Sequence, residues 1–430
     1  NTSIEQEGQI MVDFQLPLPG LARDFNELTK QEKNFIAYFS AIDMDSISPV
    51  VDCYAGIGPK GYNVFLILAR IIKIKERILS DRQLAEVLKK NDLYRFVTND
   101  IQPAHNTFNT LRKRLGPEGF VEIHKRFVLR ANSLGLLEPE IPDLPKHRKK
   151  GIILVADSTF LITCGSTKGE KDDKGHWRFK DESVAFTGKG HHAHKYPVGH
   201  KAHSLKTVNG IPMATIITAA SVSDQNAILL LLDELMGRYP DLPFAYIILD
   251  RGYDTEEIHQ DIYEQFDIIP IIIRKKMVYP KGFTTDGFPL CPWGIPMKPK
   301  GIEYERKRTK FACFKACQES EQMLPICDYL KEQYRFGYIG HTYFTNGYRK
   351  FGPALPHNAI YQKLKPLRTG IERTFGLVKE NRYRMEETNF YRGIDNVTIH
   401  TVEHDIVLTL DIIFDYLTTG KKSPVLKLNY

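Results

Sequence analysis

The sequence predicts a mixed α/β fold that follows an all-helical amino-terminal region. Up to about residue 137 the apolar residues recur at helical spacing, whereas from residue 151 short apolar runs alternate with amphipathic helices. Between residues 277 and 356 this rhythm is lost, and Gly, Pro, aromatic and basic residues dominate. We therefore expect a mixed sheet with flanking helices, interrupted by an irregular insertion that contains cysteines.

Length and composition set the broad class. The chain has 430 residues, 42% of them hydrophobic, which is enough for two or three domains and at least one sizeable core. Its apolar runs fall well short of the ~20 residues that span a bilayer. The first thirty residues lack a basic start followed by an apolar block, as an export signal would have. These features predict a cytoplasmic protein.

The net charge of +7 is compatible with a polyanionic partner. Basic residues gather at residues 146–150, at Lys275 and Lys276, and at residues 298–310. Such clusters are typical of phosphate-binding surfaces, which bind in a strongly salt-dependent way. Solvated loops are an equally good interpretation.

The amino-terminal region, residues 1–137, is expected to consist of helices. Residues 28–39 have helical periodicity, and residues 61–74 form a dense apolar run. Ser80 and Gln83 match a capping box that opens a further helix.

A short basic helix is expected over residues 106–115, with Gly116 ending it. Arg112, Lys113 and Arg114 give its end a positive charge. Short helices joined by tight turns, one of them basic, are typical of helix-turn-helix DNA-binding units. A plain helical bundle predicts the same pattern, so both interpretations stay open.

A polar, proline-containing linker over residues 138–150 leads into the first part of the α/β domain, residues 151–276. Asn209-Gly210 separates two extended runs and is a strong hairpin signal. Strands are expected at residues 152–156, 200–208, 211–219, 244–249 and 267–273, with helices at residues 225–236 and from about residue 254.

Two of these strands are predicted to end in an aspartate, Asp157 and Asp250. The carboxyl ends of such strands are where α/β proteins place ligands. Two neighbouring carboxylates repel each other unless a cation lies between them, so the pair indicates a metal site. Each aspartate alone could equally begin a turn or cap a helix.

The second part of the α/β domain is expected at residues 357–418, followed by a tail at residues 419–430. A helix near Pro366 carries an apolar stripe, and another helix is expected at residues 398–417.

Arg368, Glu372 and Lys379 form a polar line beside that stripe. If the stripe packs on the sheet, Glu372 can reach towards the strand ends. An exposed glutamate in a salt-bridged helix face would give the same pattern.

The cysteines of the insertion, Cys291, Cys313, Cys317 and Cys327, could coordinate Zn²⁺, because Cys313 and Cys317 have a spacing seen at zinc sites. There is no Cys-x2-Cys unit, so four reduced thiols are the other interpretation.

A dense run of histidines, His191, His192, His194, His200 and His203, is also present. Strand alternation would separate neighbours onto opposite faces, so we expect surface or DNA-facing positions rather than a metal site. Trp177 could stack on a base, although packing within a hairpin is the favoured interpretation.

Taken together, these motifs resemble the bacterial insertion-sequence transposases of the DDE type. Val155-Ala156-Asp157-Ser158-Thr159 resembles the motif around the first catalytic aspartate, and Leu249-Asp250-Arg251-Gly252-Tyr253-Asp254 the second. Arg368, Glu372 and Lys379 keep the Arg-x3-Glu-x6-Lys spacing, although the tyrosine expected at position 365 is Lys365. Further similar blocks are Gly61-Tyr62, Ser80-Asp81-Arg82-Gln83-Leu84, Ala104-His105-Asn106-Thr107-Phe108, Arg112-Lys113-Arg114-Leu115-Gly116, Gly199-His200-Lys201-Ala202-His203 and Ala219-Ala220-Ser221-Val222-Ser223-Asp224.

The resemblance implies a ribonuclease-H-like domain in which Asp157, Asp250 and Glu372 hold Mg²⁺ or Mn²⁺ for cutting and rejoining DNA. It implies that the partners are the terminal inverted repeats of the element and target DNA, bound by a homodimer. The DNA-binding residues expected are Arg368, Lys379, Arg112, Lys113, Arg114 and Lys201. A metal-dependent nuclease without strand transfer, or a non-catalytic DNA-binding descendant, are the competing interpretations.

Overall fold

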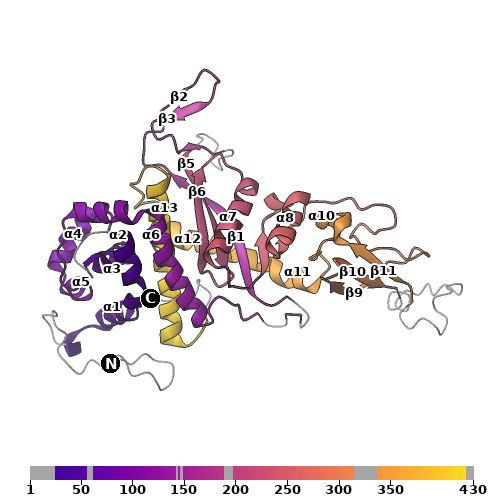
Figure 1. Ribbon diagram of the computed structural model, residues 1–430, viewed down its shortest axis with the longest axis horizontal. Coiled ribbons are helices and arrows are strands. Elements are labelled where there is room, and N and C mark those ends of the chain that lie inside the picture. Colours follow the sequence, from indigo (N-terminus) through magenta and orange to yellow (C-terminus); the bar gives the residue numbers. More distant parts are fainter. Residues whose placement is uncertain are drawn as a thin grey trace. The chain divides into compact units, whose positions relative to one another are not determined.

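The computed structural model describes residues 25–55, 62–141, 144–145, 149–187, 197–313 and 337–422. It divides into two compact units (Figure 1). Unit 1 comprises Asn1–Glu140, Asp157–Pro240 and Thr369–Tyr430, and unit 2 comprises Ile141–Ala156 and Asp241–Arg368. The chain therefore passes from unit 1 to unit 2 and back twice.

Unit 1 begins with helices, as predicted. Two of them open with capping boxes: Thr29 with Glu32, and Ser80 with Gln83. The helices are η1 (Phe25–Glu27), α1 (Lys30–Ser40), α2 (Met44–Ala55), α3 (Tyr62–Lys75), α4 (Asp81–Lys90), α5 (Asp92–Val97) and α6 (His105–Ser133).

Helix α6 is two helices joined at Gly116. This residue has φ 60° and ψ −178°, a conformation that only glycine adopts readily, and Pro117 starts the second helix at once. The prediction that the basic helix ends at Gly116 is confirmed. The segment from Pro117 to Ser133 was missed, because a Gly-Pro pair normally signals a longer break.

Helix α13 (Ile394–Thr419), yellow in Figure 1, is the central element of unit 1. It contacts α3, α6 and strand β6. Eighteen consecutive or nearly consecutive positions are buried, among them Glu403, Asp405 and Asp411. A helix that buries carboxylates needs matching cations.

For Glu403 and Asp411 such cations come from α3, whereas Asp405 accepts a hydrogen bond of 2.8 Å from Thr215. Arg70 donates to both oxygens of Glu403 and lies 3.1 Å from Asp81, while the Lys73 ammonium lies 2.7 Å from Asp81. Burial opposes ionisation of Asp81, but the charges of Arg70 and Lys73 outweigh it and lower its pKa to about 2. On the next turns Lys75 lies 2.9 Å from Asp411.

The strands of unit 1 form the antiparallel part of a mixed sheet. β5 (Val198–Thr207) pairs with β6 (Pro212–Ala219) in an antiparallel ladder, with a turn in which Gly210 has φ 93°. β4 (Ala185–Phe186) pairs with the start of β5, and α7 (Asp224–Arg238) follows β6. The predicted hairpin is confirmed.

Strand β1 (Ile152–Ile162) runs through both units, and it does not end at Asp157 as predicted. It continues through Ser158-Thr159-Phe160-Leu161-Ile162, where β-branched and aromatic residues favour extended backbone. A separate hairpin of β2 (Gly169–Lys171) and β3 (Trp177–Phe179) follows.

In unit 2 the first half of β1 pairs in parallel with β7 (Phe244–Leu249), and β7 pairs in parallel with β8 (Ile269–Ile272). Every residue of β7 is buried, as the continuous apolar run predicts. A short turn η2 (Arg251–Tyr253) and helix α8 (Glu256–Phe266) connect β7 to β8. The sheet is thus mixed, parallel in unit 2 and antiparallel in unit 1.

The described part of the insertion, residues 277–313 and 337–356, contains a regular sheet, contrary to expectation. β9 (Lys298–Glu303), β10 (Arg308–Ala312) and β11 (Ile339–Tyr343) form an antiparallel sheet in unit 2. Phe311, Met297, Cys291 and Cys313 form a small apolar core behind it. Strands of only five or six residues leave little periodicity in the sequence. η4 (Phe344–Asn346) and α10 (Tyr348–Phe351) follow the sheet.

The helix predicted near Pro366 is a series of shorter segments. They are α11 (Ala359–Leu364), η5 (Lys365–Arg368), α12 (Thr369–Gly376) and the π-helical η6 (Leu377–Asn381). Ile371 and Val378 are buried as the apolar stripe predicts. Over the residues described, none of the helices is both long and apolar enough to cross a bilayer.

Candidate functional site

Asp157 lies in the middle of β1 and is half-buried. Its Oδ1 accepts a hydrogen bond of 2.8 Å from the backbone N–H of Ser158. The Ser158 side chain in turn bonds Asp224, the first residue of α7. This contact ties the strand beside Asp157 to the helix.

Asp224 is the centre of a polar cluster in unit 1. His203 and Lys201 lie 3.3 and 3.4 Å from its Oδ1. Burial opposes ionisation of Asp224, but hydrogen bonds from His203 and Ser158 and the charge of Lys201 lower its pKa to about 2. This carboxylate therefore connects β1, β5 and α7 next to Asp157.

Asp250 follows the last residue of β7, as predicted. It is the N-cap of η2, and its Oδ1 accepts a hydrogen bond of 2.6 Å from the backbone N–H of Arg251. The Arg368 guanidinium lies 3.5 Å from its Oδ2. The predicted DNA-binding arginine is thus an ion-pair partner of the predicted metal ligand.

The turn that carries Asp250 ends at Asp254, whose side chain is fully buried. It accepts hydrogen bonds from Arg349 (2.8 Å), the backbone N–H of Lys275 (2.7 Å) and His259 (3.1 Å), and Arg274 lies 3.3 Å away. Burial opposes ionisation, yet these donors lower the pKa of Asp254 far below its ordinary value. Asp254 therefore connects the Asp250 turn to α8, to the end of β8 and to α10.

Glu372 is exposed in the first turn of α12. Its neighbours Ile371 and Thr374 are buried, so the opposite face of the helix is anchored. Further along, the Lys379 ammonium lies 2.8 Å from Glu386 and is largely covered.

Asp157 and Glu372 belong to unit 1 and Asp250 belongs to unit 2. Among the described residues, no group of three His, Cys, Asp or Glu side chains could hold a metal ion.

Two of the predicted DNA-binding residues are engaged inside unit 1. Arg112 is 2% exposed, stacks on the Tyr391 ring at 3.6 Å and donates to the carbonyl of Asn396. The expectation that Arg112 contacts DNA is wrong, because it is a core residue. The Lys201 ammonium donates to the carbonyl of Val222 at 2.9 Å, which occupies it within the protein. Lys113 and Arg114 are exposed.

Cys291 and Cys313 are buried free thiols, and Tyr338 donates its backbone N–H to the sulfur of Cys313. Cys317 and Cys327 lie outside the described residues, so zinc binding stays a prediction.

His200 and His203 are each 1% exposed, so the expectation that they face the surface or DNA is wrong. Strand β5 is buried along most of its length, and the period-two argument did not account for this. His191, His192 and His194 lie outside the described residues. Trp177 is 49% exposed and contacts Phe186 edge-on at 5.5 Å, which is the hairpin packing favoured above.

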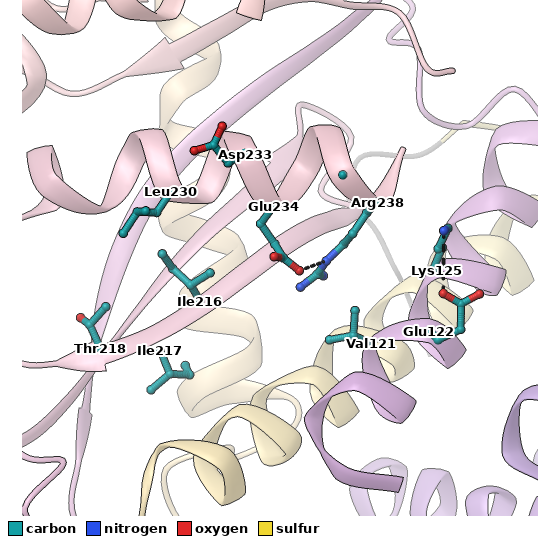
Figure 2. A pocket seen from close by; sticks show the side chains of 11 residues that line it. Val121, Glu122, Lys125, Ile216, Ile217, Thr218, Leu230, Asp233, Glu234 and Arg238 are labelled. Carbon is teal, nitrogen blue, oxygen red and sulfur yellow. Dashed lines mark hydrogen bonds and ion pairs between the residues drawn. The ribbon is translucent and has the colours of Figure 1, made fainter. Parts of the chain in front are cut away.

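A hollow of about 750 Å³ in unit 1 lies between α6, β6 and α7 (Figure 2). Val121, Ile216 and Leu230 line it, and its charged residues pair locally, as in the 2.7 Å contact between Arg238 and Glu234. None of the predicted site residues lines this hollow, so it is separate from the carboxylates.

Sequence reasoning missed Asp224 and Asp254 as organising residues. Both lie in the motif blocks given above, and each comes five residues after the last residue of a strand, Ala219 or Leu249. Their partners, such as Arg349, cannot be identified from spacing.

Comparison with known proteins identifies the family of the chain. Residues 148–402 match the family described as Transposase DDE domain. A putative transposase for insertion sequence element IS402 from Burkholderia cepacia is 30% identical over 89 residues, which cover 20% of this chain and 42% of that relative. No solved structure gives a significant match. Since the family match extends over more than half of the sequence, the chain belongs to the DDE transposases of insertion sequences.

Proposed function

We propose that this protein is a transposase that binds the ends of its element and catalyses metal-dependent DNA cleavage and strand transfer. One observation carries the proposal. In the parallel ladder of unit 2, Val155 pairs with Ile248. Asp157 comes two residues after Val155 within β1, and Asp250 comes two residues after Ile248, directly after the end of β7. A two-residue step keeps the face of the strand, so this register supports carboxylates at one level on neighbouring strands of a ribonuclease-H-like sheet.

The donor set suits Mg²⁺ or Mn²⁺, because carboxylate oxygens are the ligands these ions prefer. In both aspartates Oδ1 is oriented by the next backbone N–H. Asp157, Asp250 and Glu372 would hold the metal, with Asp157 the expected shared ligand. When bound, two such ions activate the attacking water or 3′ hydroxyl and stabilise the leaving 3′ oxygen.

The other residues position the DNA and the ligands. Arg368 lies beside Asp250, so it would contact a phosphate held at that carboxylate. Lys379 would need to leave Glu386 to make a similar contact. Asp224 and Asp254 would hold Asp157 and Asp250 in place through the hydrogen bonds described above.

Cleavage of plasmid DNA carrying the ends of the element tests the proposal. Asp157→Asn, Asp250→Asn and Glu372→Gln should each lower the cleavage rate by at least about 100-fold, the loss typical when one preorganised electrostatic group is removed. Binding to the ends should change little. Asp233→Asn, at an exposed position of unit 1, serves as the matched control.

Unchanged cleavage in any of the three variants would contradict the assignment. Capture of joined product in a target plasmid distinguishes a transposase from a nuclease on the same fold. Absence of nicking in any divalent metal would favour a non-catalytic DNA-binding protein.

A further inference from the structure

The antiparallel sheet of the insertion has one face that the small apolar core does not cover. Thr309 and Phe311 of β10 and Thr342 of β11 point towards the interior and are buried. Alternation along the strands places Arg308 and Lys310 of β10 and His341 and Tyr343 of β11 on the opposite face.

Positive charge is in excess on that face. Glu303 is paired with Arg308 at 2.7 Å and lies 3.7 Å from Arg306, whose side chain is 69% exposed. Lys310 has no acidic partner among the described residues. Across the ladder it faces His341 on one side and Gly301 on the other, so no larger side chain covers it from β9.

The neighbouring cations also act on His341. Partial burial, followed by the charges of Arg308, Lys310 and Arg306, lowers the pKa of His341 against the opposing effect of Glu303. We call Arg306, Arg308, Lys310 and His341 the basic face. Neighbouring cations of this kind repel each other, and an anion bound between them relieves the repulsion.

The sheet that carries the basic face is fixed to the part of unit 2 that carries Asp250. Lys307, in the turn between β9 and β10, lies 2.5 Å from Glu264 of α8. Tyr304 of the same turn is hydrogen-bonded to Tyr246 of β7, the strand that ends at Asp250. Tyr348 of α10 also donates to Glu264. A ligand bound to the basic face would therefore be oriented with respect to β7.

We infer that the basic face binds the phosphate backbone of duplex DNA as a second contact, away from the cleavage residues. This inference rests on the proposed function, because it assumes that the ligand of unit 2 is DNA. The contacts would be independent of sequence, since ammonium and guanidinium groups on a flat sheet read charge rather than base edges. They would hold the DNA in a fixed position relative to unit 2 during cleavage.

The test measures binding of the full chain to a fluorescent mixed-sequence DNA duplex over a range of salt concentrations. The double variant Arg306→Ala/Lys310→Ala removes two cations from the basic face and leaves the Arg308–Glu303 pair intact. The matched control is Lys281→Ala/Lys363→Ala, which removes two exposed lysines of the same unit that lie outside the basic clusters, and gives the same net charge. Thermal melting checks that all variants fold.

We expect the slope of log K against log salt to become shallower by about 0.9 for each lost phosphate contact, so by nearly 2 in the double variant. The control should keep the wild-type slope. Lys310→Arg should keep it as well, because it retains the charge. If the slope changes only with single-stranded probes, by about 0.7 for each lost residue, the basic face binds unpaired DNA. That result would overturn the assignment to duplex DNA.

The inference also fails if the double variant and the control have the same slope and affinity. That result leaves the proposed function intact, provided that the wild-type protein binds DNA and Asp250→Asn stops cleavage. If the wild-type protein neither binds nor cuts DNA, both proposals fail together.

Discussion

Glu403→Gln would remove the central acid of the ion-pair cluster between α3 and α13. Arg70 is 3% exposed and Glu403 4% exposed, and the guanidinium donates two hydrogen bonds to this carboxylate, one of them 2.7 Å long. Three cations, Arg70, Lys73 and Arg112, lower the pKa of Glu403 although burial opposes its ionisation. After the substitution these cations would share Asp81 alone as a nearby acid.

Breaking a buried ion pair by removing one partner costs about 3–5 kcal/mol. A typical domain is stable by only about 5–15 kcal/mol, so the variant should lose a large part of the free energy of unfolding of unit 1. Urea denaturation followed by helical circular dichroism measures this, since α1–α6 and α13 all belong to unit 1.

Glu387→Gln is the matched control. Glu387 is 54% exposed and lies 3.2 Å from Arg384, and a surface pair of this kind is worth about 0–1 kcal/mol. The double variant Arg70→Met/Glu403→Leu should recover part of the lost stability, because it removes Arg70 together with its carboxylate partner. If Glu403→Gln costs no more than Glu387→Gln, the ion-pair cluster does not stabilise unit 1 and the reasoning is refuted.

Three further predictions follow from buried or strained groups. His404 is buried, and burial lowers its pKa to about 4. The unfolded state therefore binds the proton more tightly than the folded state. The stability that His404 contributes, about 3 kcal/mol, is fully present above pH ~6.5 and is lost as the pH falls towards ~4. His404→Phe should therefore flatten the pH dependence of urea unfolding, and a profile as steep as wild type would contradict this. Gly116→Ala should lower the free energy of unfolding by about 1–3 kcal/mol. The cause is backbone strain alone, since an added Cβ meets no atom within 4 Å. An unchanged denaturation midpoint would show that α6 can place its bend at another residue. Asp254→Asn should destabilise unit 2 by about 3–5 kcal/mol and raise the Mg²⁺ concentration for half-maximal cleavage. Asp267→Asn, at a side chain that is 85% exposed, should do neither. If both variants need the same Mg²⁺ concentration for half-maximal cleavage, Asp254 does not position the turn that carries Asp250.

Local signals predicted many of the elements correctly. The Ser80 cap, the hairpin at Asn209-Gly210 and strand β7 ending at Asp250 all agree with the structure. In each case the signal is a hydrogen-bonding side chain, a turn residue or a continuous apolar run, and its effect extends over only a few residues. Such signals can be recognised in the sequence because the local structure they produce needs no partner from a distant part of the chain.

What could not be predicted depends on tertiary partners. Arg112 looks like a DNA-binding residue in the sequence. It is nevertheless buried, because it stacks on the Tyr391 ring and donates a hydrogen bond to the Asn396 carbonyl. The length of β1 beyond Asp157 depends on pairing with β5, which is about forty residues away in the chain. The insertion forms a sheet because Phe311 and Met297 find a shared core. No spacing rule identifies these contacts.

The candidate site follows the same division. Asp157, Asp250 and Glu372 were identified from motif order, and the register of β1 with β7 supports the first two. Asp224 and Asp254, which we propose to hold the site, act through partners that only the fold brings near.

The central claim, that Asp157, Asp250 and Glu372 share bound metal, is tested most directly by iron-directed cleavage of the protein backbone. Fe²⁺ occupies carboxylate sites of this kind and, with ascorbate and peroxide, cuts the chain next to where it is bound. We predict cuts close to all three residues, suppressed together by excess Mg²⁺ and absent in Asp157→Asn. Cuts at only one of the three positions, or cuts that Mg²⁺ does not suppress, would contradict a shared metal site.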